Sequence, residues 1–88
     1  MRSQSITIQV KFFASLKESL GVSQTNLTVP VESTVDMLLR KIQDTYGKDS
    51  QLIDISSLRV AVNQQMVEFD RVIREDDEIA IFPPITGG

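Results

Sequence analysis

The residues best suited to chemistry stand at the end of the chain, where Gly87 and Gly88 close the segment Pro-Pro-Ile-Thr-Gly-Gly. Because glycine has no Cβ, two in a row form a tail thin enough to enter a narrow channel in another protein. A terminal carboxylate presented on such a tail can be activated by a partner enzyme and then react as an acyl group. The alternative is a frayed terminus or a cloning remnant, since chain ends are often poorly ordered. The residues before the tail have to distinguish these two interpretations.

The composition excludes several other kinds of chemistry. The chain contains no cysteine and no histidine, which rules out thiol nucleophiles, histidine-based triads and Cys/His zinc sites. The formal net charge of −3 argues against nucleic-acid binding, because phosphate recognition needs a basic surface. An acidic domain is instead steered toward a partner that carries a basic patch.

The length and the hydropathy pattern predict one cytoplasmic domain without a membrane segment. The 88 residues, 41% of them hydrophobic and 24% charged, are enough for a single modest core. The start of the chain has no continuous apolar stretch of the kind found in signal peptides. The longest nearly apolar run, residues 79–85, is too short to span a bilayer and contains two prolines. We expect a folded domain over residues 1–82, followed by an extended, flexible tail over residues 83–88.

Apolar residues at every second position predict five strands. The second strand is expected to end at Pro30, which lacks a hydrogen-bond donor. Residues 63–65 are expected to form the turn of a hairpin between the third and fourth strands, although this turn lacks the usual glycine. The predicted inward residues are Ile6, Ile8, Val10, Phe12, Leu27, Val29, Leu58, Val60, Val62, Val67, Phe69, Ile79 and Ile81.

Two helices are expected between the strands. A short one over residues 14–20 ends at Gly21, and a longer one begins with Ser33 or Thr34 as its cap and ends near Gly47. The apolar face of the longer helix consists of Val35, Leu38, Leu39, Ile42 and Tyr46. This order predicts an α+β fold with a mixed sheet of about five strands and one main helix on one face. The pattern resembles the ubiquitin-like β-grasp, in which parallel first and last strands would release the tail from mid-sheet.

Four segments resemble one known family. They are Lys-Phe-Phe-Ala at 11–14, Val-Ala-Val-Asn at 60–63, Asp-Glu-Ile-Ala at 77–80, and Phe-Pro-Pro-Ile-Thr-Gly-Gly at 82–88. Together they resemble the small subunits of molybdopterin synthases, which are ubiquitin-like sulfur carriers. The likeness extends over essentially the whole chain, and its most specific element is the ending. One departure is Asp76, which stands where members often carry glycine; aspartate tolerates a left-handed turn better than most residues do.

The resemblance implies a sequence of reactions carried out with partners. An activating enzyme would use ATP to adenylate the Gly88 carboxylate, and a sulfur donor protein would convert the adenylate to a thiocarboxylate. The tail would then enter the large subunit of a heterotetramer of two small and two large subunits. There the terminal sulfur would attack the cyclic pterin precursor and help to build the dithiolene that later holds molybdenum. The chain itself would bind no cofactor, and the active site would lie mainly on the large subunit.

The resemblance also assigns roles along the tail. Pro83 and Pro84 restrict φ and lower the entropy lost when an extended peptide is presented. Ile85 and Thr86 would be gripped by the partner's channel. Gly87 and Gly88 would pass the narrowest part of the channel.

Strand parity predicts a docking surface on the sheet face away from the main helix. If the inward residues are assigned correctly, Phe13, Met66 and Phe82 all point outward. Such a cluster suggests a binding surface, whereas the alternative is scattered exposed apolar residues, which are normal. The same parity places Thr7, Gln9, Arg59, Ala61, Glu68 and Ala80 on that face. Lys17 matches a basic position near the docking surface in the family, although it can equally be an ordinary exposed helix lysine.

Other interpretations remain open. The acidic run Glu75 to Glu78 suggests a cation site, but its spacing does not match a calcium loop, so a solvated turn without metal is expected. Another β-grasp sulfur carrier, such as the thiamine-pathway protein, is usually shorter and lacks the Phe-Pro-Pro lead-in. A ubiquitin-like modifier that forms isopeptide bonds to lysines would share the activation chemistry. A stand-alone enzyme is the weakest interpretation, because no catalytic constellation is present.

Overall fold

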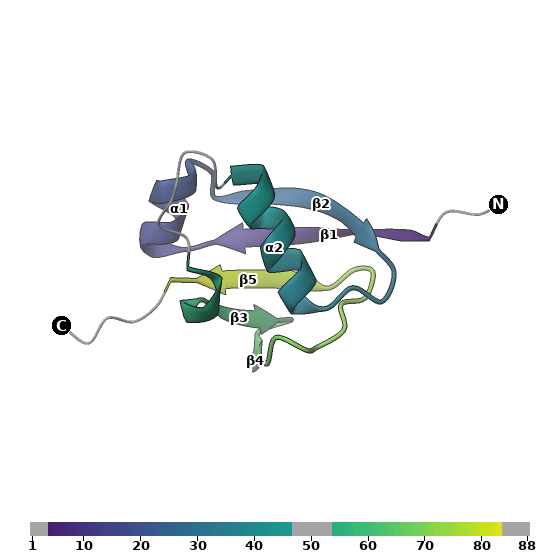
Figure 1. Cartoon of the computed structure of the whole chain (residues 1–88). Coiled ribbons are helices and arrows are strands. Elements are labelled where there is room, and N and C mark those ends of the chain that lie inside the picture. The colour runs from purple at the N-terminus through teal and green to yellow at the C-terminus, as the bar shows by residue number, and fades with distance from the viewer. Residues whose placement is uncertain (1–3, 47–53, 84–88) are drawn as a thin grey trace.

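The computed structural model describes residues 4–46 and 54–83, which form one five-stranded sheet with α2 across one face (Figure 1). The elements are β1 (Ser5–Phe12), α1 (Ala14–Leu20), β2 (Gln24–Pro30), α2 (Val35–Tyr46), a 3₁₀ turn η1 (Ile55–Ser57), β3 (Arg59–Val62), β4 (Gln65–Val67) and β5 (Glu78–Phe82). The strand order is β2-β1-β5-β3-β4, with β1 and β5 parallel and the other pairs antiparallel. The predicted α+β architecture is confirmed.

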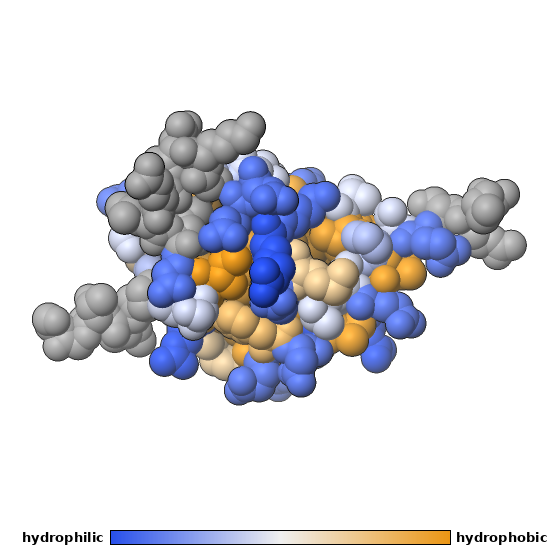
Figure 2. Space-filling model, in the orientation of Figure 1, coloured by the Kyte–Doolittle hydropathy of each residue, from blue (hydrophilic) through white to orange (hydrophobic). Residues whose placement is uncertain are grey.

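The core lies between α2 and the sheet. Val35, Leu38, Leu39 and Ile42 of α2 are at most 3% exposed and pack on the inward side chains of the strands. Those inward side chains are Ile6, Ile8, Val10, Phe12, Val29, Val60, Val62, Ile79 and Ile81. Alternation along the strands therefore predicted the buried face correctly. Figure 2 shows the α2 face of the molecule, where a polar band runs over apolar side chains.

The strand β5 lies in the middle of the sheet. It pairs in parallel with β1, where Phe12 is opposite Ile81, and antiparallel with β3, where Arg59 is opposite Phe82. The predicted parallel contact between the first and last strands is thus confirmed. The chain is described as far as Pro83, and the predicted tail residues 84–88 lie outside the described residues. The domain boundary after residue 82 stays a prediction.

The helix ends follow from local chemistry. Thr34 Oγ1 accepts a hydrogen bond of 3.3 Å from the Met37 N–H, so Thr34 caps α2. Ser33 is instead buried, and its hydroxyl donates to the Pro30 carbonyl at 2.6 Å. Gly21 ends α1 with φ of 79°, as predicted, and its N–H donates to the Lys17 carbonyl at 3.0 Å. The expected end of the longer helix at Gly47 lies outside the described residues.

The hairpin turn is one residue shorter than predicted. Asn63 and Gln64 form it with φ of 51° and 72°, while Gln65 already pairs with Val62 in β4. Two successive left-handed residues match the twist of the flanking strands, which is why glycine is usual there. Asparagine tolerates this conformation well, so the turn forms without glycine.

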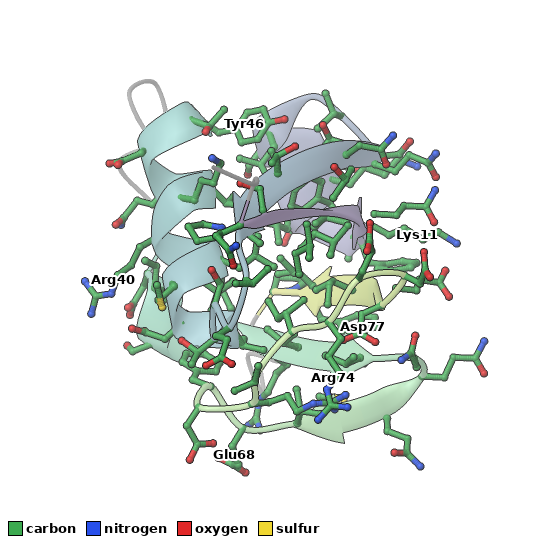
Figure 3. All side chains as sticks on the ribbon, turned by 90° about the vertical axis from the view of Figure 1, so that its right-hand side faces the viewer. Lys11, Arg40, Tyr46, Glu68, Arg74 and Asp77 are labelled. Carbon is green, nitrogen blue, oxygen red and sulfur yellow. The ribbon has the colours of Figure 1, made fainter. Side chains whose placement is uncertain are left out.

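The fourth strand also ends earlier than predicted. It stops at Val67, because the chain leaves the sheet to reach the start of α2. The carbonyls of Phe69 and Arg71 accept hydrogen bonds of 2.9 Å from the N–H groups of Asp36 and Val35. These contacts satisfy donors that the first turn of a helix leaves free. The placement of Glu68 on the outer sheet face was therefore wrong: Figure 3 shows it at the lower edge of the sheet, on the α2 side.

Candidate docking surface next to the C-terminal tail

Two phenylalanines form a stacked pair at the edge of the outer sheet face. The rings of Phe13 and Phe82 have centroids 4.9 Å apart and an interplanar angle of 15°. Phe13 directly follows β1, and its N–H donates to the Ile81 carbonyl at 3.2 Å, which extends the parallel pairing by one residue. Phe13 is 39% exposed and Phe82 is half-buried. The last residue of β5 is thus held against the residue after β1.

A shallow groove of about 410 Å³ adjoins this pair. Its floor comes from Ala61 and Ala80, which lie opposite each other in β3 and β5. Met66, 60% exposed, lies opposite Ala61 in β4 and forms the far wall. The groove is hollow because these two alanine side chains are smaller than the side chains around them. Ala61 is only 6% exposed, because neighbouring residues cover it. We call the surface of Phe13, Ala61, Met66, Ala80 and Phe82 the outer groove.

The rim of the outer groove carries one closed ion pair. Lys11 of β1 binds the carboxylate of Glu78 of β5, and both side chains are partly exposed. Figure 3 shows Lys11 on the side of the sheet away from α2, while Arg40 projects from α2 on the other side. An exposed pair of this kind contributes little to stability, typically about 0–1 kcal/mol. It leaves the groove with no net charge at this end.

A polar network fixes the chain just outside the groove. Asn63 donates its side-chain N–H to Asp77 Oδ1 at 2.8 Å, and its Oδ1 accepts from the Glu78 N–H at 3.0 Å. Asp77 Oδ2 also accepts from the Arg74 N–H at 2.8 Å. Asp77 is 8% exposed, so the expectation of a fully solvated acidic turn is wrong for this residue. Its position could not be inferred from a run of acids, because burial depends on Asn63, fourteen residues earlier.

The middle of the acidic turn faces solvent. Glu75 and Asp76 are exposed, and Asp76 has φ of 76°, a left-handed conformation that aspartate tolerates better than most residues do. Among the residues that the structure describes, no three potential ligands are grouped closely enough to hold a metal ion. Over the same residues, no helix has the length and hydrophobicity needed to cross a bilayer.

The structure brings together three of the predicted site residues, Phe13, Met66 and Phe82, around one groove. The segments at 11–14, 60–63 and 77–80, which carried part of the family resemblance, are distant in sequence, but each contributes residues to the lining of this groove. Lys17 lies on α1, exposed and one turn beyond Phe13, and it does not line the groove. Pro83 is half-buried, and the predicted roles of residues 84–88 fall outside the described residues.

Comparison with known proteins places the sequence in a family. The ThiS family matches residues 10–88. The molybdopterin synthase sulfur carrier subunit of Escherichia coli (strain K12) is 35% identical over 81 residues, covering 92% of this chain and 99% of that protein. The protein of the same name from Dictyostelium discoideum is 37% identical over 83 residues, covering 91% and 94% of the two chains.

Solved structures show the same fold. SAMP1 from Haloferax volcanii superposes with a TM-score of 0.77 at 24% identity, covering 93% of this chain and 99% of that one. The ubiquitin of Caldiarchaeum subterraneum gives a TM-score of 0.66 at 13% identity, covering 96% and 99%. At these identities the likeness concerns the fold alone. The chain therefore belongs to the ThiS family, with the sulfur carrier subunits of molybdopterin synthase as its relatives and the ubiquitin-like β-grasp as its fold.

Proposed function

We propose that this chain is the sulfur carrier subunit of a molybdopterin synthase and that Gly88 delivers the sulfur as a thiocarboxylate. One observation carries the proposal. The central strand β5 ends at Phe82, which belongs to the exposed aromatic pair of the outer groove and directly precedes the tail. The docking surface therefore includes the last residue of β5, and the segment that leads to Gly88 follows it directly in the sequence. The shared name of the curated relatives supports the same role.

The chemistry begins with activation of the terminal carboxylate. A carboxylate is a poor acyl donor, because oxide is a poor leaving group. An activating enzyme joins it to AMP, taken from ATP with release of pyrophosphate. The persulfide of a sulfur donor protein then attacks the acyl carbon and displaces AMP, which joins Gly88 to the donor through an acyl disulfide. A second thiol attacks the donor sulfur of this bond, forms a disulfide with the donor and releases Gly88 as the thiocarboxylate. The resulting thiocarboxylate supplies the soft nucleophile that a chain without cysteine otherwise lacks.

The chain contributes binding and positioning, while partners contribute acid–base catalysis. It has no histidine that could titrate near neutral pH. Phe13, Met66 and Phe82 offer apolar area to the large subunit, and burying each is worth about 1.5–3 kcal/mol. Pro83 and its neighbour Pro84 limit the conformations of the tail before it enters the partner. The precursor meets the sulfur inside the large subunit, where water is excluded.

Reconstitution tests the proposal. The purified chain is incubated with ATP, the activating enzyme and a sulfur donor, and its intact mass is followed. We expect replacement of one terminal oxygen by sulfur, and loss of that sulfur only when both the large subunit and the pterin precursor are added. Isopeptide conjugates to lysines in a cell extract, without sulfur transfer, would favour a protein modifier. Transfer of sulfur to a thiazole precursor instead would favour a thiamine-type carrier.

A further inference from the structure

Arg59 is the first residue of β3 and lies directly opposite Phe82 in the sheet. Its side chain is exposed, and strand parity directs it to the same face as Ala61 and Phe82. A positive charge therefore stands beside the aromatic residue from which the tail departs. The strands contribute one other cation to this face, Lys11, and that side chain is held by Glu78.

The fold keeps Arg59 out of cross-strand pairing with the nearest acid along the ladder. Val60 pairs with Val67, so continuing the ladder by one residue would place Glu68 opposite Arg59. The ladder stops there, because the segment after Val67 crosses to the start of α2, where the Phe69 carbonyl accepts from the Asp36 N–H. A second groove of about 700 Å³ opens between the separated strands, with Arg59, Met66 and Glu68 in its lining.

Arg59 consequently has no ionic partner among the described residues. Within residues 4–46 and 54–83, the ion pairs join Lys11 to Glu78, Arg40 to Asp36 and Arg71 to Asp77. Met66 lines both grooves, so the groove that Arg59 lines adjoins the apolar docking surface. When Phe82 and Met66 are covered by a partner, Arg59 loses water as well. A charge that is desolvated without a counter-charge is strongly unfavourable.

We infer that Arg59 determines which partner the outer groove accepts, by binding a carboxylate that the partner presents beside its apolar socket. This inference rests on the proposed function. A guanidinium forms two parallel hydrogen bonds with a carboxylate, so a partner that carries the acid at the matching position binds more tightly. A partner with a matching apolar socket but no acid there is rejected, because the arginine would be buried unpaired. The contact sets specificity, whereas the aromatic residues supply most of the buried area.

The test measures the dissociation constant between the chain and the purified large subunit from the same organism. Arg59→Gln should weaken binding about three- to tenfold, and Arg59→Glu by more than tenfold, because it places like charges together. Arg59→Lys should restore part of the loss, since it keeps the charge but not the paired geometry. Added salt should weaken the wild-type complex more than the Arg59→Gln complex.

A matched control is Arg40→Gln, which removes the same charge from the exposed side of α2 on the opposite sheet face. It should leave both the affinity and the salt dependence unchanged. Exchanging acids of the large subunit for amides, one at a time, should reveal one variant that weakens binding to the wild type but adds nothing to Arg59→Gln. That coupling identifies the carboxylate.

Phe82→Asp, measured in parallel, tests the docking surface separately from the role of Arg59. If Phe82→Asp weakens binding while Arg59→Gln matches the wild type in affinity and salt dependence, the role of Arg59 is wrong and the docking surface stands. If neither substitution changes the affinity, the docking surface itself is wrong. Melting curves of all variants show whether each chain is folded. If Arg59→Glu is destabilised, the comparison of Arg59→Gln with the conservative variant Arg59→Lys still tests the role of the charge.

Discussion

At the scale of single residues, Phe82 and its neighbour Ile81 have different roles, one in partner recognition and the other in core packing. Its neighbour Ile81 is fully buried in the core, while Phe82 points to the opposite face and stacks on Phe13. Successive residues of a strand face opposite sides, so a shift of one position exchanges a stability role for a binding role.

Phe82→Asp should therefore reduce affinity for the large subunit at least tenfold, because the buried ring contributes about 1.5–3 kcal/mol and about 1.4 kcal/mol corresponds to that factor. The melting temperature of the isolated chain should change little. Ile81→Asp is the matched control and should unfold the chain, since it buries an unpaired charge. Comparable destabilisation by both substitutions would contradict the assignment of Phe82 to the outer face.

Asp77 is the one buried acidic side chain among the described residues, and its carboxylate connects two turns. It accepts from the Asn63 side chain and from the Arg74 N–H, each at 2.8 Å, and Arg71 lies 3.9 Å away. The network holds the hairpin turn against the start of β5 and thereby positions Glu78 at the rim of the outer groove.

Asp77→Ala should lower the free energy of unfolding by about 1.5–3 kcal/mol, because it removes hydrogen bonds made to a charged acceptor. Urea denaturation monitored by circular dichroism gives the value. Glu75→Ala, an exposed acid in the same turn, should stay within about 0.5 kcal/mol of the wild type. Equal effects of the two substitutions would show that Asp77 does not anchor the turn.

At the scale of elements, the length of the short strand β4 is set by two structural requirements. It must pair with β3 for long enough to place Met66 opposite Ala61, and it must then release the chain to satisfy the first N–H groups of α2. The turn before it is as short as a hairpin allows, and both of its residues take positive φ.

Gln64→Gly should stabilise the chain by roughly 0.5 kcal/mol, because a left-handed residue with a Cβ is strained and glycine is not. Gln65→Gly is the control, because Gln65 is already paired in β4. There glycine should destabilise by about 0.5–1 kcal/mol. Thermal melts of both variants decide the matter, and a loss of stability in Gln64→Gly would argue against a two-residue turn.

At the scale of the whole molecule, the position of β5 joins the core to the terminus. Among the residues that the structure describes, the buried core extends no further than Ile81, and β5 is bonded on both sides by β1 and β3. A pull applied at Pro83 is therefore resisted by the middle of the sheet.

Deleting Gly88, or replacing Gly87 by Phe, should abolish sulfur transfer while the melting temperature stays the same, because the described core ends at Ile81, well before these residues in the sequence. A chain extended by a tag after Gly88 should likewise fail to accept AMP, since its carboxylate has moved. Activity is measured as thiocarboxylate formation and precursor conversion. Full activity of the truncated chain would refute the role of Gly88.

Much of the fold followed from short-range patterns in the sequence. Alternation in β1 and helical spacing in α2 identified the buried faces, because one face of each element must be apolar to form a core. Those assignments in turn placed Phe13, Met66 and Phe82 outward together. The diglycine ending suggested the chemistry, since it depends on a terminus rather than on assembled side chains.

Three features were decided only by the tertiary structure. Asp77 is buried because Asn63, far away in sequence, offers it a hydrogen bond. Glu68 leaves the outer face because carbonyls of the chain after Val67 accept hydrogen bonds from the first N–H groups of α2. Arg59 is consequently left without its cross-strand acid beside Phe82. Each depends on where a distant segment goes to satisfy its polar groups, and local periodicity carries no information about that choice.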